Sequence, residues 1–237
     1  MNADPGERLN ADPGVGGCIM LTETARDHAF RGWRDAADAG ARNGWAFEGS
    51  GEEISLYARS PDGARLLVVA GRQIATAEGL EVSALGVDRE FADGADLPAS
   101  IRAVHDSGAV AVLPWGFGKW WLKRGKLIAA AVEAGGADRV FVGDSGVRPG
   151  SLPQPLPLRM AERRNLPILS GSDPLPLAGE EDRAGSFGFV LDGEIDQERP
   201  AEGLKTLIRA LSAQPRTFGT HAATAAFIRD QVRLRLR

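Results

Sequence analysis

The stretch Leu169-Ser170-Gly171-Ser172-Asp173-Pro174-Leu175-Pro176 has the form of a short buried strand that ends at a glycine and turns a carboxylate outward. Glycine at such a junction lets the backbone turn sharply or approach a ligand closely. In parallel α/β folds, ligand sites are built from the loops that follow the carboxyl ends of the strands. The stretch therefore predicts a core strand and a site at its end.

Three earlier stretches repeat this order of an apolar run, a glycine and a charged side chain. They cover residues 66–73, 109–119 and 140–148. Four strand ends of one kind predict a group of loops that share one face of the fold. The sequence thus predicts where a site lies, but it does not identify a reaction.

Beyond Asp96 the sequence alternates between helical and extended patterns. Short strands that alternate with helices predict a largely parallel sheet, and the number of strands suits a distorted (β/α) barrel, open or closed. Helices are expected at residues 97–107, 125–134, 157–164, 202–213 and 220–237, and strands at residues 109–113, 139–142, 167–170 and 187–191.

Before Asp96 the pattern differs. A helix is expected at residues 24–43, and extended runs at residues 54–59 and 65–70 flank the turn-forming string Ser60-Pro61-Asp62-Gly63. Proline fixes φ at the first corner of such a turn and Asp-Gly accommodates the second, so these runs predict a hairpin that embellishes the barrel. Residues 80–87 are expected to form a further strand.

The first residues repeat a turn-forming pentapeptide. Asn2-Ala3-Asp4-Pro5-Gly6 recurs as Asn10-Ala11-Asp12-Pro13-Gly14, with almost no apolar content. We expect residues 1–19 to be a flexible leader and residues 20–237 to be a single α/β domain, since 237 residues can bury one sizeable core.

The composition excludes several classes of protein. Hydrophobic residues at 43% and charged residues at 25% are ordinary for a globular chain, and a net charge of −4 argues against a general nucleic-acid binder. No apolar run is long enough to span a bilayer, and the start lacks the features of a signal peptide. We expect a cytoplasmic protein with no nucleic-acid or membrane partner; its oligomeric state is left open.

The glycine-rich loops carry the candidate site residues. Their cations suit a phosphate or carboxylate, and their carboxylates suit a metal ion or a general base. The alternative is that these charges are solvated or form structural ion pairs. Trp115 is expected to line a pocket by stacking, against the alternative of a packed lid. The cations are Arg72, Lys119, Lys123, Arg124 and Arg148, and the carboxylates are Glu78, Asp144, Asp173, Glu180 and Glu181.

Three segments resemble the PHP superfamily, the polymerase-and-histidinol-phosphatase barrels. Residues 70–82 are similar to a strand that ends in Gly-x-Glu, residues 101–115 to a helix and strand that end in Ala-His-Pro, and residues 171–175 to the Gly-Ser-Asp-Ala-His element. The resemblance covers roughly residues 66–191 and implies a PHP-type barrel that hydrolyses phosphoesters with a cluster of metals.

The sequence departs from that family where the metal ligands should be. Gln73 stands at the carboxylate position of Gly-x-Glu, Pro114 or Trp115 replaces the histidine of Ala-His-Pro, and Leu175 replaces the last histidine. Asp173 alone carries over. The resemblance thus implies the barrel, whereas the replacements remove most of the multinuclear metal centre.

Two functions follow as expectations. The first is a PHP-like barrel with a degenerate metal centre that binds a small anionic ligand, phosphorylated or not; its cofactor is left open between none and one divalent metal ion. The alternative is a phosphoesterase-type hydrolase with one divalent ion, Mn, Zn or Mg. The residues that the first assigns to the ligand are Arg72, Trp115, Lys119, Arg124 and Arg148; the second has Asp144 and Asp173 as catalytic residues and Asp173, Glu78 and His28 as metal ligands.

Overall fold

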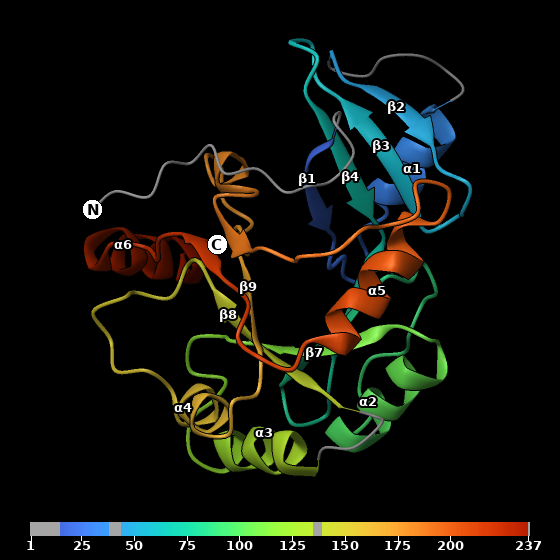
Figure 1. Ribbon diagram of the computed structural model, residues 1–237. Helices are drawn as coiled ribbons and strands as arrows, with labels where there is room; N and C mark the ends of the chain where they lie inside the picture. Colours follow the sequence, from blue (N-terminus) through green and yellow to red (C-terminus); the bar gives the residue numbers. More distant parts are fainter. Residues whose placement is uncertain (1–14, 38–43, 135–138, 237) are drawn as a thin grey trace.

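The computed structural model describes residues 15–37, 44–134 and 139–236 (Figure 1). These residues form a four-stranded sheet, a five-stranded sheet and a two-stranded ribbon. In Figure 1 the four-stranded sheet lies at the top, and the five-stranded sheet lies below it among most of the helices.

The four-stranded sheet has the order β1-β4-β3-β2. β1 (Val15–Met20) runs parallel to β4 (Arg65–Val69), which pairs antiparallel with β3 (Ser55–Arg59), and β3 pairs antiparallel with β2 (Ala46–Gly49). The predicted turn joins β3 to β4 with Gly63 at φ +89°, a left-handed conformation that glycine adopts readily. The predicted hairpin is confirmed, although it forms the centre of a sheet instead of an addition to a barrel.

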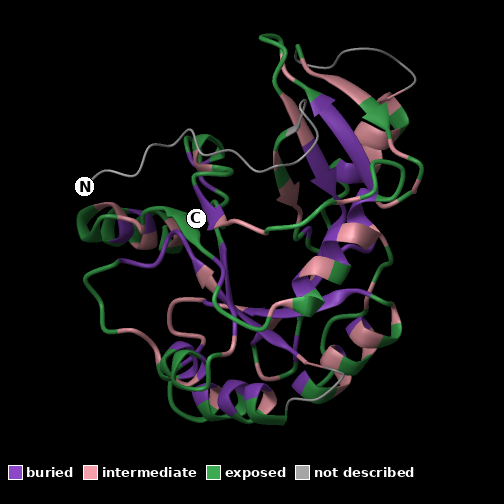
Figure 2. Ribbon diagram, in the orientation of Figure 1, coloured by how far each residue is buried: buried purple, intermediate pink, exposed green. Residues whose placement is uncertain are grey.

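Alternation along these strands places a helix on each face of the four-stranded sheet. Leu56 and Val68 pack with Phe30 of α1 (Ala29–Ala36). Tyr57 and Leu67 point the other way, toward α5 (Pro200–Ala210). The central strand β3 and the end of β4 are therefore buried on both sides, and Figure 2 draws them in purple, whereas the edge strands β1 and β2 are intermediate or exposed.

The five-stranded sheet has the order β5-β6-β7-β8-β9. β5 (Gly71–Ala75), β6 (Glu81–Leu85) and β7 (Val110–Pro114) pair antiparallel, whereas β7, β8 (Phe141–Ser145) and β9 (Ile168–Gly171) pair in parallel. The parallel strands thus end at one edge of the sheet, which we call the carboxyl edge. β6 begins at that edge because it runs the opposite way to β7.

Helices cover both faces of the five-stranded sheet. α2 (Leu97–Asp106), α3 (Lys123–Ala134) and α4 (Leu156–Arg163) bury Leu97, Ile128 and Leu158 in one large apolar cluster. On the other face, Val110, Phe141 and Leu169 pack with Ile208 of α5. Because α5 also contacts the four-stranded sheet through Ala201 and Leu204, this helix packs against both sheets (Figure 1).

A single residue, Ala70, separates β4 from β5. Its N–H donates to the carbonyl of Ile54 (2.8 Å) in the first sheet, and its carbonyl accepts from the N–H of Gly86 (2.9 Å) in the second. The segment after β1 follows β5, since Glu23 donates to Gly71 (3.0 Å) and accepts from Gln73 (2.8 Å) through backbone groups. The two sheets are thus joined by continuous backbone hydrogen bonding.

The last part of the chain adds a ribbon and a helix. β10 (Phe187–Phe189) and β11 (Thr217–Gly219) pair antiparallel and lie beside β9. The 3₁₀ turn η1 (Glu181–Arg183) precedes the ribbon, and α6 (Thr224–Arg235) follows it.

The predicted largely parallel barrel is wrong. The five-stranded sheet is open and has two antiparallel and two parallel pairings, whereas β1 to β4 form a separate sheet and β10 and β11 a ribbon. The physical reason lies at residues 76–80, a connection too short for a crossover helix, so that β6 must return antiparallel to β5. The alternating pattern was real, but it holds only from β7 to β9.

Most of the individual helices and strands form where the sequence predicts them, although they do not assemble into a barrel. The helices predicted from residue 97 onward and the strands at β6, β7, β8 and β9 are confirmed within a few residues at their ends. The helix predicted at residues 24–43 is the shorter α1, and residues 38–43 lie outside the described residues. Residues 15–19, which the sequence places in a leader, belong to β1; residues 1–14 lie outside the described residues.

Within the described ranges, every helix is too short or too polar to cross a membrane.

Candidate functional site

The carboxyl edge brings together polar side chains from four separate segments. Lys119 follows β7, Asp144 lies near the end of β8, and Asp173 follows β9, as expected for loops at the ends of neighbouring parallel strands. Glu81 joins them from the beginning of β6. Together with Arg148, which binds Asp144 from the loop after β8, four of the predicted site residues therefore lie at one edge of the sheet.

Asp173 is held by a hydrogen bond and by an unusual backbone conformation. Its Oδ2 accepts from the hydroxyl of Ser145, at 2.8 Å, and Ser145 is itself buried at the end of β8. Its φ of +48° is left-handed, a region that aspartate enters more readily than most residues but at some energetic cost. The surrounding structure thus fixes one face of this carboxylate.

The pKa of Asp173 is raised. The main cause is desolvation by the protein atoms that fill most of the space around the carboxylate; the hydrogen bond from Ser145 opposes it, the negative charge of Glu81 adds to it, and the positive charge of Lys119 opposes it. Asp173 as a whole residue is nevertheless exposed to solvent. An exposed carboxylate whose affinity for protons is increased can accept a hydrogen bond or a proton from a bound molecule.

Lys119 and Glu81 form an ion pair next to Asp173. The Nζ of Lys119 contacts Oε1 of Glu81, and the amide of Gln73 donates to the same oxygen at 2.9 Å. The Lys119 side chain remains 37% exposed, so part of it faces solvent beside Glu81. The charges of Lys119 and Glu81 both act on the Asp173 carboxylate through space, so the three groups influence one another electrostatically.

A second network at the carboxyl edge is almost fully paired. Arg148 holds both oxygens of Asp144, with Nε to Oδ1 at 2.6 Å and Nη2 to Oδ2 at 2.7 Å. The Nε2 of His221 lies 2.8 Å from Asp144 Oδ2 and 2.9 Å from Arg148 Nη2. One ring nitrogen can donate to the carboxylate or accept from the guanidinium, but not both at once. Arg148 and Asp144 thus satisfy each other.

Trp115 does not line an open pocket. It is buried in the large apolar cluster, and its ring centroid lies 6.5 Å from that of Phe227 in α6. Phe117 makes edge contacts with Phe227 at 5.0 Å and with Trp121 at 5.3 Å. The aromatic group is therefore packed between the loop after β7 and α6, as the alternative of a packed lid expects.

Arg72 and His28 lie together, but in a separate network between β5 and the segment before α1. The buried Arg72 donates to the carbonyl of Asp27 (2.8 Å) and to Asp88 (2.7 Å), and its Nη1 is 3.4 Å from His28 Nδ1. Asp88 also accepts from Arg31 (2.9 Å). Because these groups join the segment before α1 to β5 and the loop after β6, they form a structural ion-pair network.

Glu78 and Arg124 also have structural partners. Glu78 Oε1 accepts from the N–H of Leu97 (3.2 Å) at the start of α2, and Arg124 Nη2 donates to the carbonyl of Gly118 (2.8 Å). Desolvation raises the pKa of Glu78, but hydrogen bonds from Thr76 and from the Leu97 amide outweigh it and lower the pKa. A carboxylate at a helix start is a common capping arrangement.

The predicted metal ligands Asp173, Glu78 and His28 thus belong to three different hydrogen-bond networks. Among residues 15–37, 44–134 and 139–236, no three His, Cys, Asp or Glu side chains are grouped so that they could hold a metal ion.

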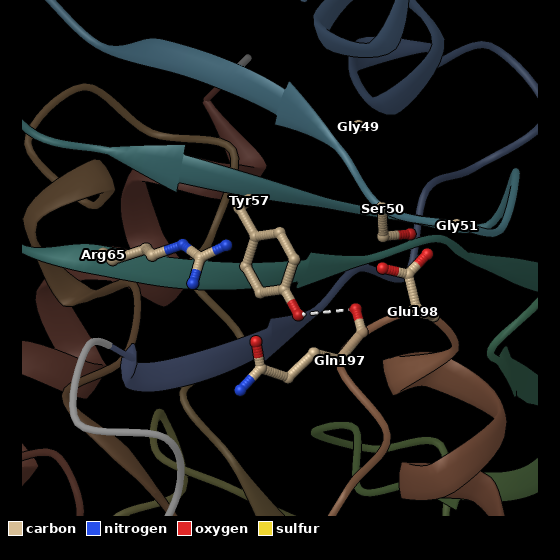
Figure 3. Close-up of a pocket in the computed structure, with 7 residues that line it drawn as sticks. All are labelled: Gly49, Ser50, Gly51, Tyr57, Arg65, Gln197 and Glu198. Carbon is tan, nitrogen blue, oxygen red and sulfur yellow. Dashed lines mark hydrogen bonds between the residues drawn. The ribbon is translucent and has the colours of Figure 1, made fainter.

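A small polar hollow of about 290 Å³ lies away from these residues (Figure 3). The Arg65 guanidinium lies 3.7 Å from the centre of the Tyr57 ring, and the Tyr57 hydroxyl donates to the carbonyl of Gln197 at 3.0 Å. The hollow contains none of the predicted site residues, and we assign the site to the carboxyl edge on its chemistry. The lining residues are Gly49, Ser50, Gly51, Tyr57, Arg65, Gln197 and Glu198.

Sequence reasoning missed three residues of the carboxyl edge. Ser145 stands beside Asp144 in a stretch that the sequence did single out, so its position was visible although its role was not. Glu81 is the first residue of a strand that arrives antiparallel, and His221 contacts Asp144 across 77 residues. No local pattern indicates either contact.

No protein-family model matches the chain, and no curated protein sequence matches it. The crystal structure of PsfC from Pseudomonas syringae PB-5123 is similar over 72% of this chain, with 16% sequence identity and a TM-score of 0.42. The chain covers 65% of the length of PsfC. A likeness of this degree carries no argument about fold or function.

Proposed function

We propose that the carboxyl edge binds a small polar molecule that carries a phosphate or carboxylate group and a hydroxyl or amine. Lys119 pairs with the acidic group, and Asp173 accepts a hydrogen bond from the hydroxyl or amine. The observation that carries the proposal is Asp173 itself, a carboxylate with a raised pKa that is held by Ser145 near the partly exposed side chain of Lys119.

The choice of Lys119 follows from the partners of the other cations. Arg72 is buried against Asp88, Arg124 donates to a backbone carbonyl, and Arg148 is bound at two points by Asp144. Lys119 has one carboxylate partner and is more than a third exposed. A lysine ammonium with three donors can hold Glu81 and a phosphate oxygen together.

The test uses inorganic phosphate and glycerol phosphate as probes, with thermal shift and calorimetric titration as readouts. Glycerol phosphate should raise the melting temperature and bind more tightly than inorganic phosphate, because only it offers a hydroxyl to Asp173. Asp173→Asn should weaken its binding by roughly 10- to 100-fold, the effect of losing a charged hydrogen bond, and Lys119→Gln should weaken both probes.

Lys126→Gln is the matched control, since it removes an exposed lysine of α3 that lies outside the carboxyl-edge cluster. It should bind both probes as the unchanged protein does. The proposal fails if neither probe gives a shift at about 10 mM, a concentration that would reveal even weak binding. It also fails if Lys119→Gln and Lys126→Gln behave alike.

A further inference from the structure

The outward face of α6 carries an apolar stripe. Ile228 and Val232 are 57% and 51% exposed, and Leu236, directly after the helix, is 82% exposed. Phe227 and Asp230 face the protein and are buried. At about 100° per residue, the three exposed apolar side chains fall within an arc of about 80° on the side away from the buried residues.

Arginines flank this stripe. On the same helical geometry, Arg229 and Arg233 lie along one side of it and Arg235 along the other, about 20–60° from its edges. Asp230 pairs with Arg229 (2.8 Å) and Arg233 (3.5 Å) from its buried position, and the buried Glu180 also acts on Arg229. The exposed part of the helix therefore presents apolar side chains between positive charges.

The loop before α3 adds a second exposed apolar group beside α6. Trp121 is 61% exposed and Leu122 is 89% exposed, with a left-handed φ of +54° that is unusual for leucine. Phe117 contacts Trp121 and also Phe227 of α6, with ring centroids 5.3 Å and 5.0 Å away. The tip of this loop therefore lies next to α6.

Positive charge is concentrated in these two segments. Residues 119–126 and 224–237 contain eight of the 28 basic residues of the chain but one of its 32 acidic residues, so the remainder of this chain is strongly acidic. Exposed tryptophan and leucine between basic side chains favour the boundary between acyl chains and anionic headgroups. The basic residues are Lys119, Lys123, Arg124, Lys126, Arg229, Arg233, Arg235 and Arg237.

We propose that α6 and the Trp121–Leu122 tip form a docking surface for a bilayer that contains anionic lipid. The protein would lie on the bilayer, because the described helices cannot span one. The sequence predicted no membrane partner from the lack of a spanning segment, which does not address binding at the surface. A second copy of the chain fits this face less well, since paired α6 helices would bring like charges together.

The experiment is sedimentation of the full chain with phosphatidylcholine vesicles, with and without about 30% phosphatidylglycerol, an anionic fraction chosen to give a negative surface potential. The protein should pellet with the anionic vesicles and stay largely in solution with the neutral ones. An Ile228→Asp/Val232→Asp double variant should lose at least tenfold of its binding, and Arg235→Gln about fivefold, at roughly 1 kcal/mol for each basic residue.

Leu152→Asp/Leu156→Asp is the matched control, because it places the same two negative charges at leucines that are 39% and 47% exposed, before and at the start of α4. Its binding should be unchanged, and circular dichroism should show all variants folded. Equal binding to neutral and anionic vesicles, or no effect of the double variant, would overturn the proposal. A dimer of the unchanged protein that light scattering shows to be lost in the double variant would also overturn the proposal, provided that neither protein binds vesicles. That result would assign the surface to a second copy of the chain.

Discussion

Replacing Gly71 by alanine should destabilise the protein strongly. Gly71 begins β5, immediately after the residue that separates the two sheets. A Cβ at this position would lie 2.0 Å from the carbonyl oxygen of Leu21 and 2.9 Å from that of Ala84, both of them backbone atoms. Neither neighbour can move away by a change of side-chain rotamer, so the segment after β1 must separate from β5.

The magnitude follows from the hydrogen bonds at this junction. Separation weakens three backbone bonds: Leu21 to Val69 (2.9 Å), Glu23 to Gly71 (3.0 Å) and Gln73 to Glu23 (2.8 Å). At about 1 kcal/mol each, their loss amounts to about 3 kcal/mol of unfolding free energy, and overpacking typically costs about 1–3 kcal/mol. We expect a loss of about 2–4 kcal/mol, or roughly 5–15 °C in melting temperature.

Urea unfolding followed by circular dichroism measures this loss, and Gly49→Ala is the matched control. Gly49 ends β2 and has no left-handed φ, and a methyl group on its Cα would meet no atom within 4 Å, so its replacement should change stability by less than about 1 kcal/mol. Both variants reduce the entropy of the unfolded chain equally, which leaves the steric effect as the difference. Equal stability of the two variants would refute the reasoning.

Two further predictions separate structural charges from site charges. Arg72→Met should reduce the unfolding free energy by about 3 kcal/mol, because it removes the guanidinium from the buried Glu23 and from the Asp27 carbonyl and leaves Asp88 with Arg31 and Arg34 alone. Phosphate binding at the carboxyl edge should be unchanged. Normal stability with weakened phosphate binding would instead make Arg72 a ligand contact. Because the folded-state pKa of Asp173 is raised, its contribution to stability is fully present below the unfolded pKa and is lost as pH rises through the folded pKa. Asp173→Asn should therefore be more stable than the unchanged protein at about pH 7, by less than about 1 kcal/mol because Asp173 is exposed. This gain in unfolding free energy should vanish near about pH 3, where the unchanged carboxyl is protonated as well. Denaturant melts at both pH values measure the gain, and a gain that grows on acidification would contradict the prediction.

Some features of this fold depend on local pattern alone. The turn at residues 60–63 and the helices after residue 97 were predictable, because proline, glycine and apolar spacing act within a few residues of each other. The ends of β7, β8 and β9 were predicted to share an edge, and they do, because parallel strands joined by helices must end on the same side. Lys119, Asp144 and Asp173 were placed together on that basis.

The sequence by itself therefore determined the helices, most of the strands and the position of three polar residues at one sheet edge. Only the tertiary structure decided that β5 and β6 pair antiparallel, so that Arg72 is buried against Asp88 while the charge of Glu81 acts on Asp173. It also decided that His221 meets Asp144. Such contacts join segments far apart in the chain, and they depend on how whole faces of sheets and helices pack, which no local spacing of residues specifies.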